Sequence, residues 1–412
     1  MAQPRRSDLA LGLRANAGQF ALLVGVNALV GGMVGQERAV VPLLAGEVFG
    51  LAATYSALTF LVAFGVAKAA TNLVAGVLAD RYGRKPVLVF GWLVGVPVPI
   101  LLILAPDWTW VMAANALLGI NQGLTWSTTV LMKIDLAGPR RRGLALGLNE
   151  ASGYLAVAAA AFVTGLIAER AGLRPAPFFL GIAIAGLGLG TSLLLVRETR
   201  GHVAIEHDAA DARPVATWRS VAWQTTITDP SLSAACQAGF VNNLNDGLAW
   251  GLLPLVQAAY GLSIGEIGLL AAAYPATWGI VQIVTGAASD RTGRKPPIMI
   301  GMILQAVAIA WIAFAPGLLS WLLAAVVLGI GTALVYPTLI AVIADVAPPK
   351  QRGATVGIYR FWRDLGFAVG AIIVGLVADA IGANAAILVV AAVTALSGLV
   401  VGLRMRETRA TG

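Results

Sequence analysis

One charged element occurs twice in this chain, at a fixed offset. Residues 76–85 read GVLADRYGRK and residues 286–295 read GAASDRTGRK, so the copies lie 210 positions apart with every charge in place. Three more pairs keep this offset: Gly119 with Gly329, Asp135 with Asp345, and Arg142 with Arg352. The tetrapeptide RETR at 197–200 recurs at 406–409, one residue out of step. A register held this long indicates a duplicated unit.

We therefore expect two structural halves, residues 1–198 and 231–412, joined by the polar segment 199–230. The chain is 58% hydrophobic and 12% charged, far from an ordinary soluble domain. A helix needs about 20 apolar residues to cross a bilayer, and each half offers six such runs. They lie at 17–43, 54–79, 87–105, 108–134, 141–168 and 176–196, then at 232–258, 263–289, 296–315, 317–345, 353–378 and 384–404. The sequence predicts an all-α membrane protein with twelve transmembrane helices.

The net charge of +8 reflects membrane topology. Most Lys and Arg residues fall in the termini and in the loops on one side of this arrangement, which places both termini in the cytoplasm. A nucleic-acid partner therefore has no support. Cys236 is the only cysteine, so a disulfide within the chain is excluded.

Charged side chains inside the apolar runs are the first candidates for function, because each costs about 3 kcal/mol unless it faces a cavity or a partner. Asn27 and Arg38 share one face of the first run. Glu37 and Arg38 have two interpretations, a local pair near the outer membrane surface or a gate or substrate contact. Lys68 lies too deep in the second run to reach water, so it needs an anion from the protein or from a ligand.

Polar and aromatic residues in later runs extend this set. Trp126 and Tyr336 occupy equivalent positions in the two halves, and Gln122 lies one turn from Trp126. Such aromatic residues serve either as packing or as a ligand clamp. Asn242 and Asp246 are four residues apart and share a polar helical face, which must line a cavity or bind another helix.

The eleventh run carries an unusual density of charge. Its Arg360 occupies the repeat position of Glu150, with opposite sign. Arg360 and Asp364 are four residues apart and can pair within the helix, which would leave Arg363 unpaired. Counted from the inner ends of their helices at about 1.5 Å per residue, Lys68 and Asp364 reach nearly equal depth.

The polar segment offers an apparent metal site and little else. His202, Glu206, His207 and Asp208 are all potential ligands, but nothing fixes their geometry, so a solvated linker is expected and no metal. The tryptophans at its end, 218 and 223, suggest a segment along the membrane surface. The chain lacks a phosphate-binding glycine loop and a nucleophile–histidine pair, so we expect neither an enzyme nor a cofactor.

The repeated element resembles the signature G-x-L-x-D-R-x-G-R-[KR] of the major facilitator superfamily. It is matched at Gly76, Leu78, Asp80, Arg81, Gly83, Arg84 and Lys85. The resemblance implies two six-helix bundles that rock around a central cavity. Helices 1, 4, 7 and 10 would line the cavity, and helices 2, 5, 8 and 11 would form the seam between the halves.

In this family the signature aspartate, here Asp80, latches to the start of helix 11 and stabilises the outward-facing form. The helix N-terminus is a natural site for an anion, which gives the latch a physical basis. The latch residues that follow from the resemblance are Gly76, Asp80, Arg81, Gly83, Arg84 and Asp135, with Asp290, Arg291 and Arg294 in the second copy. Since helices 2 and 11 face each other in this family, we expect Lys68 to approach Asp364, directly or through solute.

This sequence departs in two places from the motifs of the family's drug exporters, which argues against a multidrug antiporter. The drug exporters of the family carry R-x-x-Q-G in helix 4, whereas this chain has Gln122 and Gly123 but Gly119 at the arginine position. They also carry a proline-containing element in helix 5, and residues 153–165 contain no proline.

We therefore expect a secondary transporter of a small organic anion or zwitterion in the cytoplasmic membrane, because guanidinium groups bind carboxylates well. The alternatives are a multidrug/proton antiporter for lipophilic or cationic compounds, and a receptor or assembly protein that does not transport. The expected partners are a small-molecule solute, a coupling ion (a proton, by symport or antiport) and membrane lipid, with the chain as a monomer. The expected substrate-binding residues are Asn27, Arg38, Lys68, Gln122, Trp126, Asn242, Asp246, Tyr336, Arg360 and Arg363.

A coupling carboxylate must be semi-buried, so that its protonation can change during transport. Asp246, Glu150, Glu37 and Asp364 are the candidates, and Asp246 is preferred because neighbouring asparagines offer it hydrogen bonds. The alternative for Glu150 is a simple polar contact across the seam with Gln282.

Overall fold

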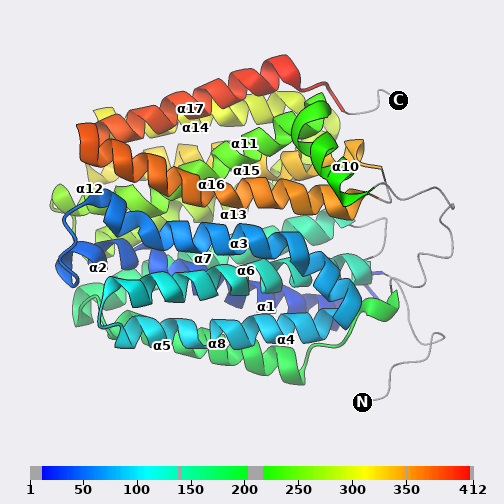
Figure 1. Cartoon of the computed structure of the whole chain (residues 1–412), viewed down its shortest axis with the longest axis horizontal. Helices are drawn as coiled ribbons and strands as arrows, with labels where there is room; N and C mark the ends of the chain where they lie inside the picture. Colours follow the sequence, from blue (N-terminus) through cyan, green and yellow to red (C-terminus); the bar gives the residue numbers. More distant parts are fainter. Residues whose placement is uncertain (1–11, 138–141, 203–216, 349–350, 409–412) are drawn as a thin grey trace.

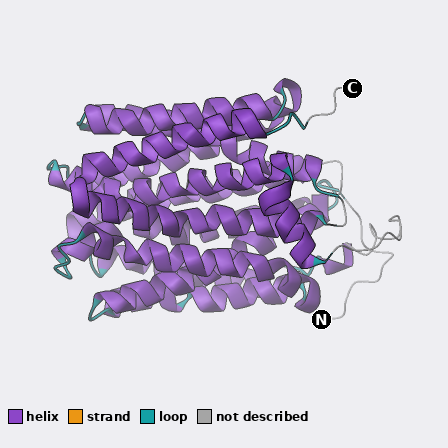
Figure 2. Ribbon diagram, turned by 45° about the horizontal axis from the view of Figure 1, so that its top comes forward, coloured by secondary structure: helices purple, strands orange, loops and turns teal. Residues whose placement is uncertain are grey.

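The computed structural model describes residues 12–137, 142–202, 217–348 and 351–408. Every regular element in these ranges is a helix (Figure 2). The helices run nearly parallel to one long axis, and both chain termini lie at the same end of the bundle (Figure 1). We call this end the terminal end and the opposite one the distal end.

The first half contains six long helical segments, two of them interrupted. Pro42 lies in the first turn of α2 and Pro97 opens α5, which is where a proline is tolerated, and each break falls just before them. The helices are α1 (Ala17–Arg38), α2 (Val41–Glu47), α3 (Thr54–Tyr82), α4 (Arg84–Gly95), α5 (Pro97–Leu104), α6 (Trp108–Ala137), α7 (Arg142–Ala171) and α8 (Ala176–Leu194).

The second half repeats this plan after a short helix at the terminal end. Its first long segment is interrupted by the π-helix η4, directly before Pro254 in the first turn of α12. The elements are α10 (Trp218–Trp223), the π-helix η3 (Gln224–Thr228), α11 (Pro230–Gly247), η4 (Leu248–Leu252), α12 (Leu253–Ala259), α13 (Ile264–Thr292), α14 (Lys295–Phe314), α15 (Leu318–Val346), α16 (Arg352–Ile381) and α17 (Ala383–Arg404).

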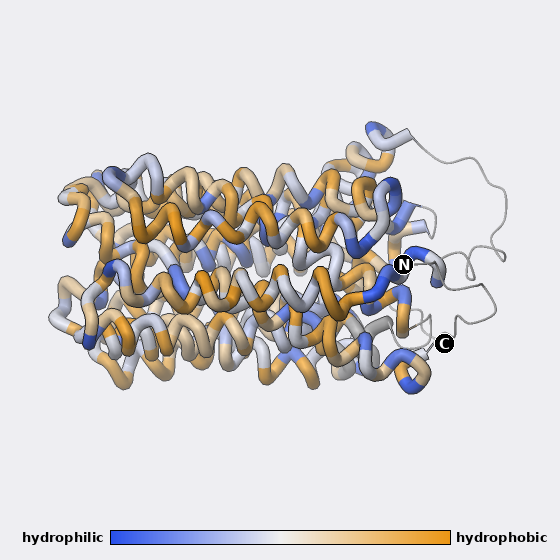
Figure 3. The backbone as a smooth tube through the Cα atoms, turned by 90° about the horizontal axis from the view of Figure 1, so that it is seen from below, coloured by the Kyte–Doolittle hydropathy of each residue, from blue (hydrophilic) through white to orange (hydrophobic). Residues whose placement is uncertain are grey.

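Among the described residues, ten segments are long and apolar enough to cross a membrane. The other two expected spans correspond to α6 and to α11 with α12, which are helical and contain several buried amide and charged side chains. Large hydrophobic side chains are exposed on most of the long helices, as expected of a membrane protein, and hydrophobic positions predominate along the helices (Figure 3). The all-α membrane fold is confirmed, and the count of twelve spanning helices stays a prediction.

The seam between the halves is formed as the resemblance implied. The segments expected as helices 2 and 11, α3 and α16, pack along one another, and so do α7 and α13, the expected helices 5 and 8. Small residues bring the backbones together: a Cβ added to Gly65 of α3 would meet the backbone nitrogen of Ala368, and one added to Gly165 of α7 would meet Gly268. Close approach of this kind is typical of helices that pack in lipid.

The repeated charged element connects helices within each half. Glu198, of the RETR element, accepts hydrogen bonds from the backbone N–H groups of Arg84 and Lys85, both at 3.0 Å, and so caps the start of α4. Glu407 does the same at the start of α14, with Arg294 at 2.7 Å and Lys295 at 3.2 Å. Each copy of RETR therefore supplies a glutamate that caps the start of a helix in its own half.

Candidate functional site

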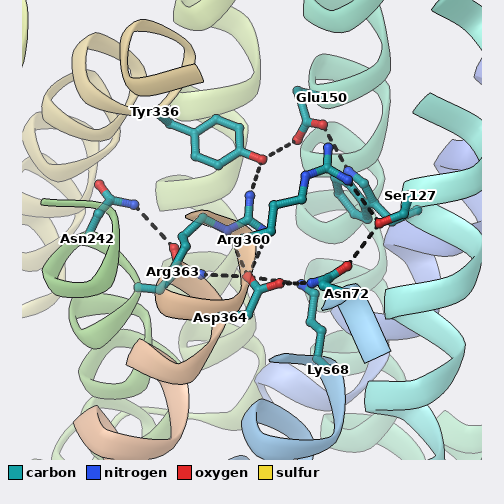
Figure 4. A network of polar contacts seen from close by, with 11 residues as sticks. Lys68, Asn72, Ser127, Glu150, Asn242, Tyr336, Arg360, Arg363 and Asp364 are labelled. Atoms are coloured by element: carbon teal, nitrogen blue, oxygen red, sulfur yellow. Dashed lines mark hydrogen bonds and ion pairs between the residues drawn. The ribbon is translucent and has the colours of Figure 1, made fainter. Parts of the chain in front are cut away.

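Asp364 of α16 is the centre of a buried polar network between the halves (Figure 4). Its carboxylate forms an ion pair with Arg363 (2.6 Å from Nη2), accepts a hydrogen bond from Asn243 (3.1 Å), and accepts another from Asn72 across the seam. The Lys68 Nζ lies 4.0 Å from Asp364 Oδ1. The expected approach of Lys68 and Asp364 is thus present in the structure.

The pairing expected within α16 is wrong. Asp364 pairs with its neighbour Arg363 instead of with Arg360. The Arg360 guanidinium extends toward the first half and donates to Ser127 Oγ at 2.9 Å. Ser127 in turn donates to Asn72 at 2.9 Å, so the polar chain returns to Asp364 through α3. The carboxylate is already occupied by donors from three helices, which leaves Arg360 to bind the other half.

Both carboxylate oxygens of Glu150, on α7, accept hydrogen bonds. Its carboxylate accepts hydrogen bonds from Trp126 (3.0 Å), Asn149 (3.1 Å) and the Tyr336 hydroxyl (2.9 Å). The alternative contact with Gln282 is wrong, because the buried amide of Gln282 has no hydrogen-bond partner.

Tyr336 extends the network of Glu150 across the seam. The Arg363 guanidinium donates to the Tyr336 hydroxyl, which donates to Glu150. Tyr336 of the second half therefore joins an acidic group of the first half to a basic group of its own half (Figure 4).

Asp246 of α11 differs from the other carboxylates. It is 1% exposed; Oδ1 accepts a hydrogen bond from the Tyr274 hydroxyl at 2.7 Å, while Oδ2 has no hydrogen-bond partner. The asparagines expected to serve it bond elsewhere: Asn243 donates to Asp364 and Asn245 to Gln305. A cavity of about 20 Å³, enough for the centre of one water molecule, is lined by Tyr274. Asp246 is thus a buried carboxylate with one free acceptor.

Glu37 and Arg38 are fully buried at the end of α1, and both interpretations, a local pair and a gate or substrate contact, stay predictions. None of the three guanidinium nitrogens of Arg38 has a hydrogen-bond partner. The Arg38 guanidinium lies 4.9 Å from the ring centroids of both Phe64 and Trp250, one from each half. The Asn115 side chain lies beside Glu37, yet neither carboxylate oxygen has a hydrogen bond of good geometry.

Aromatic rings surround these charges. Lys68 Nζ lies 5.3 to 5.8 Å from the centroids of Phe64, Trp126 and Phe367. Tyr154 of the first half stacks on Trp278 of the second at 3.5 Å between centroids. Sequence reasoning missed Tyr154, Tyr274 and Trp278 as site residues, because an aromatic residue in an apolar run is usually packing.

Two predicted substrate-binding residues form hydrogen bonds within the first half, and their role in binding stays a prediction. Asn27 of α1 donates to the Asn149 carbonyl at 2.7 Å, and Gln122 of α6 donates to the Val30 carbonyl at 2.9 Å. Lys133 of α6, which was not predicted, is completely buried and donates to the Leu23 carbonyl at 2.9 Å. These residues join α1 to α6 and α7. Asn242, by contrast, accepts from Gln305 at 3.1 Å within the second half.

Within the described residues, Asp80 contacts its own half and not the start of α16, and the predicted latch stays a prediction. The Asp80 side chain is 73% exposed and its carboxylate pairs with Arg84 at 2.6 Å. Arg84 also pairs with Asp135 at 3.2 Å, and the copy repeats this with Arg294 and Asp345 at 3.0 Å. Gly76 meets no neighbour, Gly83 lies against Glu198, and Arg81 and Arg291 are exposed. The side chain of Asp290 lies outside the described residues.

The described part of the linker, residues 199–202 and 217–230, supplies no contact to the network around Asp364. His202 is buried, and burial lowers its pKa. Glu206, His207 and Asp208 lie outside the described residues, and no group of three metal-ligating side chains occurs within the described ranges. Trp218 and Trp223 of α10 are 56% and 62% exposed.

The fold and the buried charges between two repeated halves define a polytopic membrane transporter. The sequence profile of the Major Facilitator Superfamily matches residues 20–243 and again 235–412. The chain therefore belongs to this superfamily, whose members are transporters and not enzymes.

Similarity to individual proteins is more distant. The multidrug resistance protein MdtG of Enterobacter lignolyticus is 25% identical over 371 residues, 87% of this chain and 84% of that protein. The hexuronate transporter of Bacillus subtilis is 28% identical over 143 residues, which cover only 35% of this chain and 34% of that protein. A POT family transporter solved with a thioalcohol-conjugated peptide shares the fold, with a TM-score of 0.75, 12% identity and coverage of 93% and 95%.

The network around Asp364 gives a first prediction. Replacing Asp364 by Ala leaves Arg363 and Lys68 buried without their anion, so we expect a loss of about 3 kcal/mol in stability, seen as a lower thermal unfolding temperature in detergent. Lys68→Ala alone should cost less. The double variant Lys68→Ala/Asp364→Ala should regain part of the loss, because one uncompensated cation is removed. No recovery would mean that Lys68 and Asp364 are not coupled.

Proposed function

We propose that this protein is a proton-coupled secondary transporter of a small organic anion or zwitterion. The observation that carries the proposal is Arg38, a fully buried guanidinium between the halves with no hydrogen bond to any of its nitrogens. An unused guanidinium offers five donors in a planar fork, which fits a carboxylate or phosphate through two parallel hydrogen bonds. Its flat faces rest against Phe64 and Trp250, which hold the plane without using any donor.

Neighbouring cations support the same class of solute. Lys68 lies 4.0 Å from Asp364, at the limit of an ion pair, and Phe64 packs against both Lys68 and Arg38. A carboxylate placed near Phe64 would meet one guanidinium and one ammonium group. The acidic groups in the same region, Glu37 and Asp246, would receive the ammonium end of a zwitterion.

Asp246 is the proposed proton carrier. Asp364 and Glu150 each accept at least three hydrogen bonds or ion pairs, so both oxygens of each carboxylate already have a donor. Asp246 has one donor, Tyr274, and one oxygen without a partner. Binding of an anion at Arg38 would neutralise the positive charge that lies beside Asp246, which would couple solute binding to this carboxylate.

The orientation follows from the charge distribution. The terminal end carries most of the basic loops and would face the cytoplasm, with the protein in the cytoplasmic membrane. The halves pack closely at the distal end, where Gly165 meets Gly268, while Asp80 at the terminal end is exposed. This conformation would therefore offer its site to the cytoplasm.

A second candidate function is a multidrug/proton antiporter. The aromatic group formed by Trp126, Tyr154, Trp278 and Tyr336 around Glu150 would suit a lipophilic cation. The similarity to MdtG over most of the chain favours it too. Against it, every acceptor oxygen of Glu150 is already bonded, whereas the donors of Arg38 are free.

A thermal-stability screen separates these two candidates. The purified protein would be heated with glucuronate, benzoate, succinate or alanine, and in parallel with tetraphenylphosphonium or ethidium. A ligand at one hundred times its Kd stabilises by about 2.7 kcal/mol, which is readily seen. We expect an anion or the zwitterion to raise the unfolding temperature, and Arg38→Gln to abolish that rise. Stabilisation by the cations alone would favour the antiporter.

A further inference from the structure

We propose that two acidic residues at the distal end, Asp379 and Glu169, form a reciprocal latch that holds the two halves together there. Asp379 lies near the end of α16. Its Oδ1 accepts a hydrogen bond from the backbone N–H of Thr54 at 2.7 Å, and its Oδ2 accepts one from Tyr55 at 2.9 Å. Thr54 and Tyr55 open α3, so their N–H groups have no partner within the helix. A carboxylate of the second half thus caps a helix of the first.

The internal repeat supplies a second copy of this arrangement. Glu169 of α7 is the repeat equivalent of Asp379, 210 positions earlier, and Gly265 of α13 is the equivalent of Tyr55. The Glu169 carboxylate lies against Gly265, so that a Cβ added there would collide with Oε2. A residue of the first half therefore meets a helix start in the second. Here the contact is weaker, because the capping box of Ser263 and Glu266 already satisfies the start of α13.

Close helix packing accompanies both contacts. Gly375, one turn before Asp379, lies so near the Tyr55 backbone that a Cβ would clash with Tyr55 Cα. Its repeat equivalent Gly165, one turn before Glu169, meets Gly268 in the same way. In both copies a glycine allows the helices to approach, and the carboxylate one turn later reaches the start of the facing helix. The internal repeat thus places an acidic residue of each half beside the start of a helix in the other half, with the backbone hydrogen bonds present in the Asp379 copy.

The terminal end shows the opposite state. Asp80, at the other end of α3, pairs with Arg84 and is 73% exposed. Helices α3 and α16 therefore carry aspartates at opposite ends; among the described residues, Asp379 caps the helix of the other half, whereas Asp80 pairs within its own half. We infer that Asp379 stabilises the state closed at the distal end, in balance with Asp80 at the terminal end. The inference does not depend on the identity of the solute.

A labelling experiment tests this latch. Leu58 lies one turn beyond Tyr55, is fully buried, and packs against Gly251 of η4 in the distal seam. A Leu58→Cys reporter in a Cys236→Ser background would react with a soluble maleimide only when that end opens. Loss of a helix cap shifts an equilibrium about fivefold, so Asp379→Ala should raise the labelling rate about fivefold. Glu169→Ala should raise it less, and Asp80→Asn should lower it.

A matched control removes a cap that does not join the halves. Asp107 accepts a hydrogen bond from the Thr109 N–H at 2.8 Å, at the start of α6 and within the first half. Asp107→Ala should leave the labelling rate unchanged. Should Asp379→Ala purify poorly, Asp379→Asn keeps the shape and one acceptor, and is expected to give a smaller rise. An unchanged rate in the Asp379 variant that folds, or an equal rise in Asp107→Ala, would overturn the proposal.

Discussion

Arg38→Gln is expected to weaken solute binding about a hundredfold or more, while leaving the protein folded. The Arg38 guanidinium makes no hydrogen bond in the structure, so its loss leaves no protein acceptor without a donor. Its neighbours are the rings of Phe64 and Trp250, against which a glutamine side chain can also pack, and the carboxylates of Glu37 and Asp246, so the loss of this cation should lower stability somewhat. A hydrogen-bonded charge pair with a ligand carboxylate would be lost, which typically costs about 2–5 kcal/mol. Isothermal titration with the solute found by the stability screen measures the change.

Arg38→Lys separates charge from geometry. An ammonium group keeps the positive charge but cannot form two parallel hydrogen bonds with one carboxylate, so an intermediate loss is expected. Arg219→Gln, on the exposed face of α10, is the control and should bind normally. Full binding by Arg38→Gln, with an unfolding temperature like that of the parent, would remove Arg38 from the substrate site.

Asp246→Asn is expected to abolish accumulation of solute against its gradient and to retain exchange of solute for solute. The amide keeps the oxygen that accepts from Tyr274, so the local structure should persist. It cannot gain or lose a proton, so an imposed pH gradient no longer drives transport. For one proton per neutral cycle, one pH unit supports about tenfold accumulation, and this ratio should fall to one.

Accumulation and exchange can both be measured in proteoliposomes with radiolabelled solute, with an acidic exterior for accumulation. Glu47→Gln, an exposed carboxylate at the distal end, is the control and should accumulate solute like the parent. Loss of both accumulation and exchange in Asp246→Asn would make Asp246 a substrate ligand instead. Retention of both would exclude it from coupling.

Much of the fold could be predicted because hydropathy locates each helical segment separately, and the internal repeat relates every segment of one half to a segment of the other. Each expected apolar run corresponds to one helical segment of the structure, and the offset of 210 located equivalent positions in both halves. Depth could be predicted as well, since helices of known rise placed Lys68 and Asp364 at one level, and they lie 4.0 Å apart.

The pairing of individual side chains could not be predicted in this way. The spacing of Arg360 and Asp364 suggested a pair, but donors from α3 and α11 already occupy Asp364. The asparagines expected to donate to Asp246 donate to Asp364 and Gln305, and Asp246 accepts its hydrogen bond from Tyr274 of another helix. These outcomes depend on which faces meet across the seam, which a single helical period does not specify. The function of Asp379 required the same knowledge, because its partners are more than three hundred residues away.

The most direct test of the central claim is uptake driven by a proton gradient. Proteoliposomes with the parent protein would be given an inward proton gradient and labelled glucuronate, benzoate, succinate or alanine, with labelled tetraphenylphosphonium in parallel. The account predicts that at least one of these anions or the zwitterion accumulates, that a protonophore abolishes accumulation, and that Arg38→Gln abolishes it too. Gradient-driven movement of the lipophilic cation alone, unaffected by Arg38→Gln, would contradict the account.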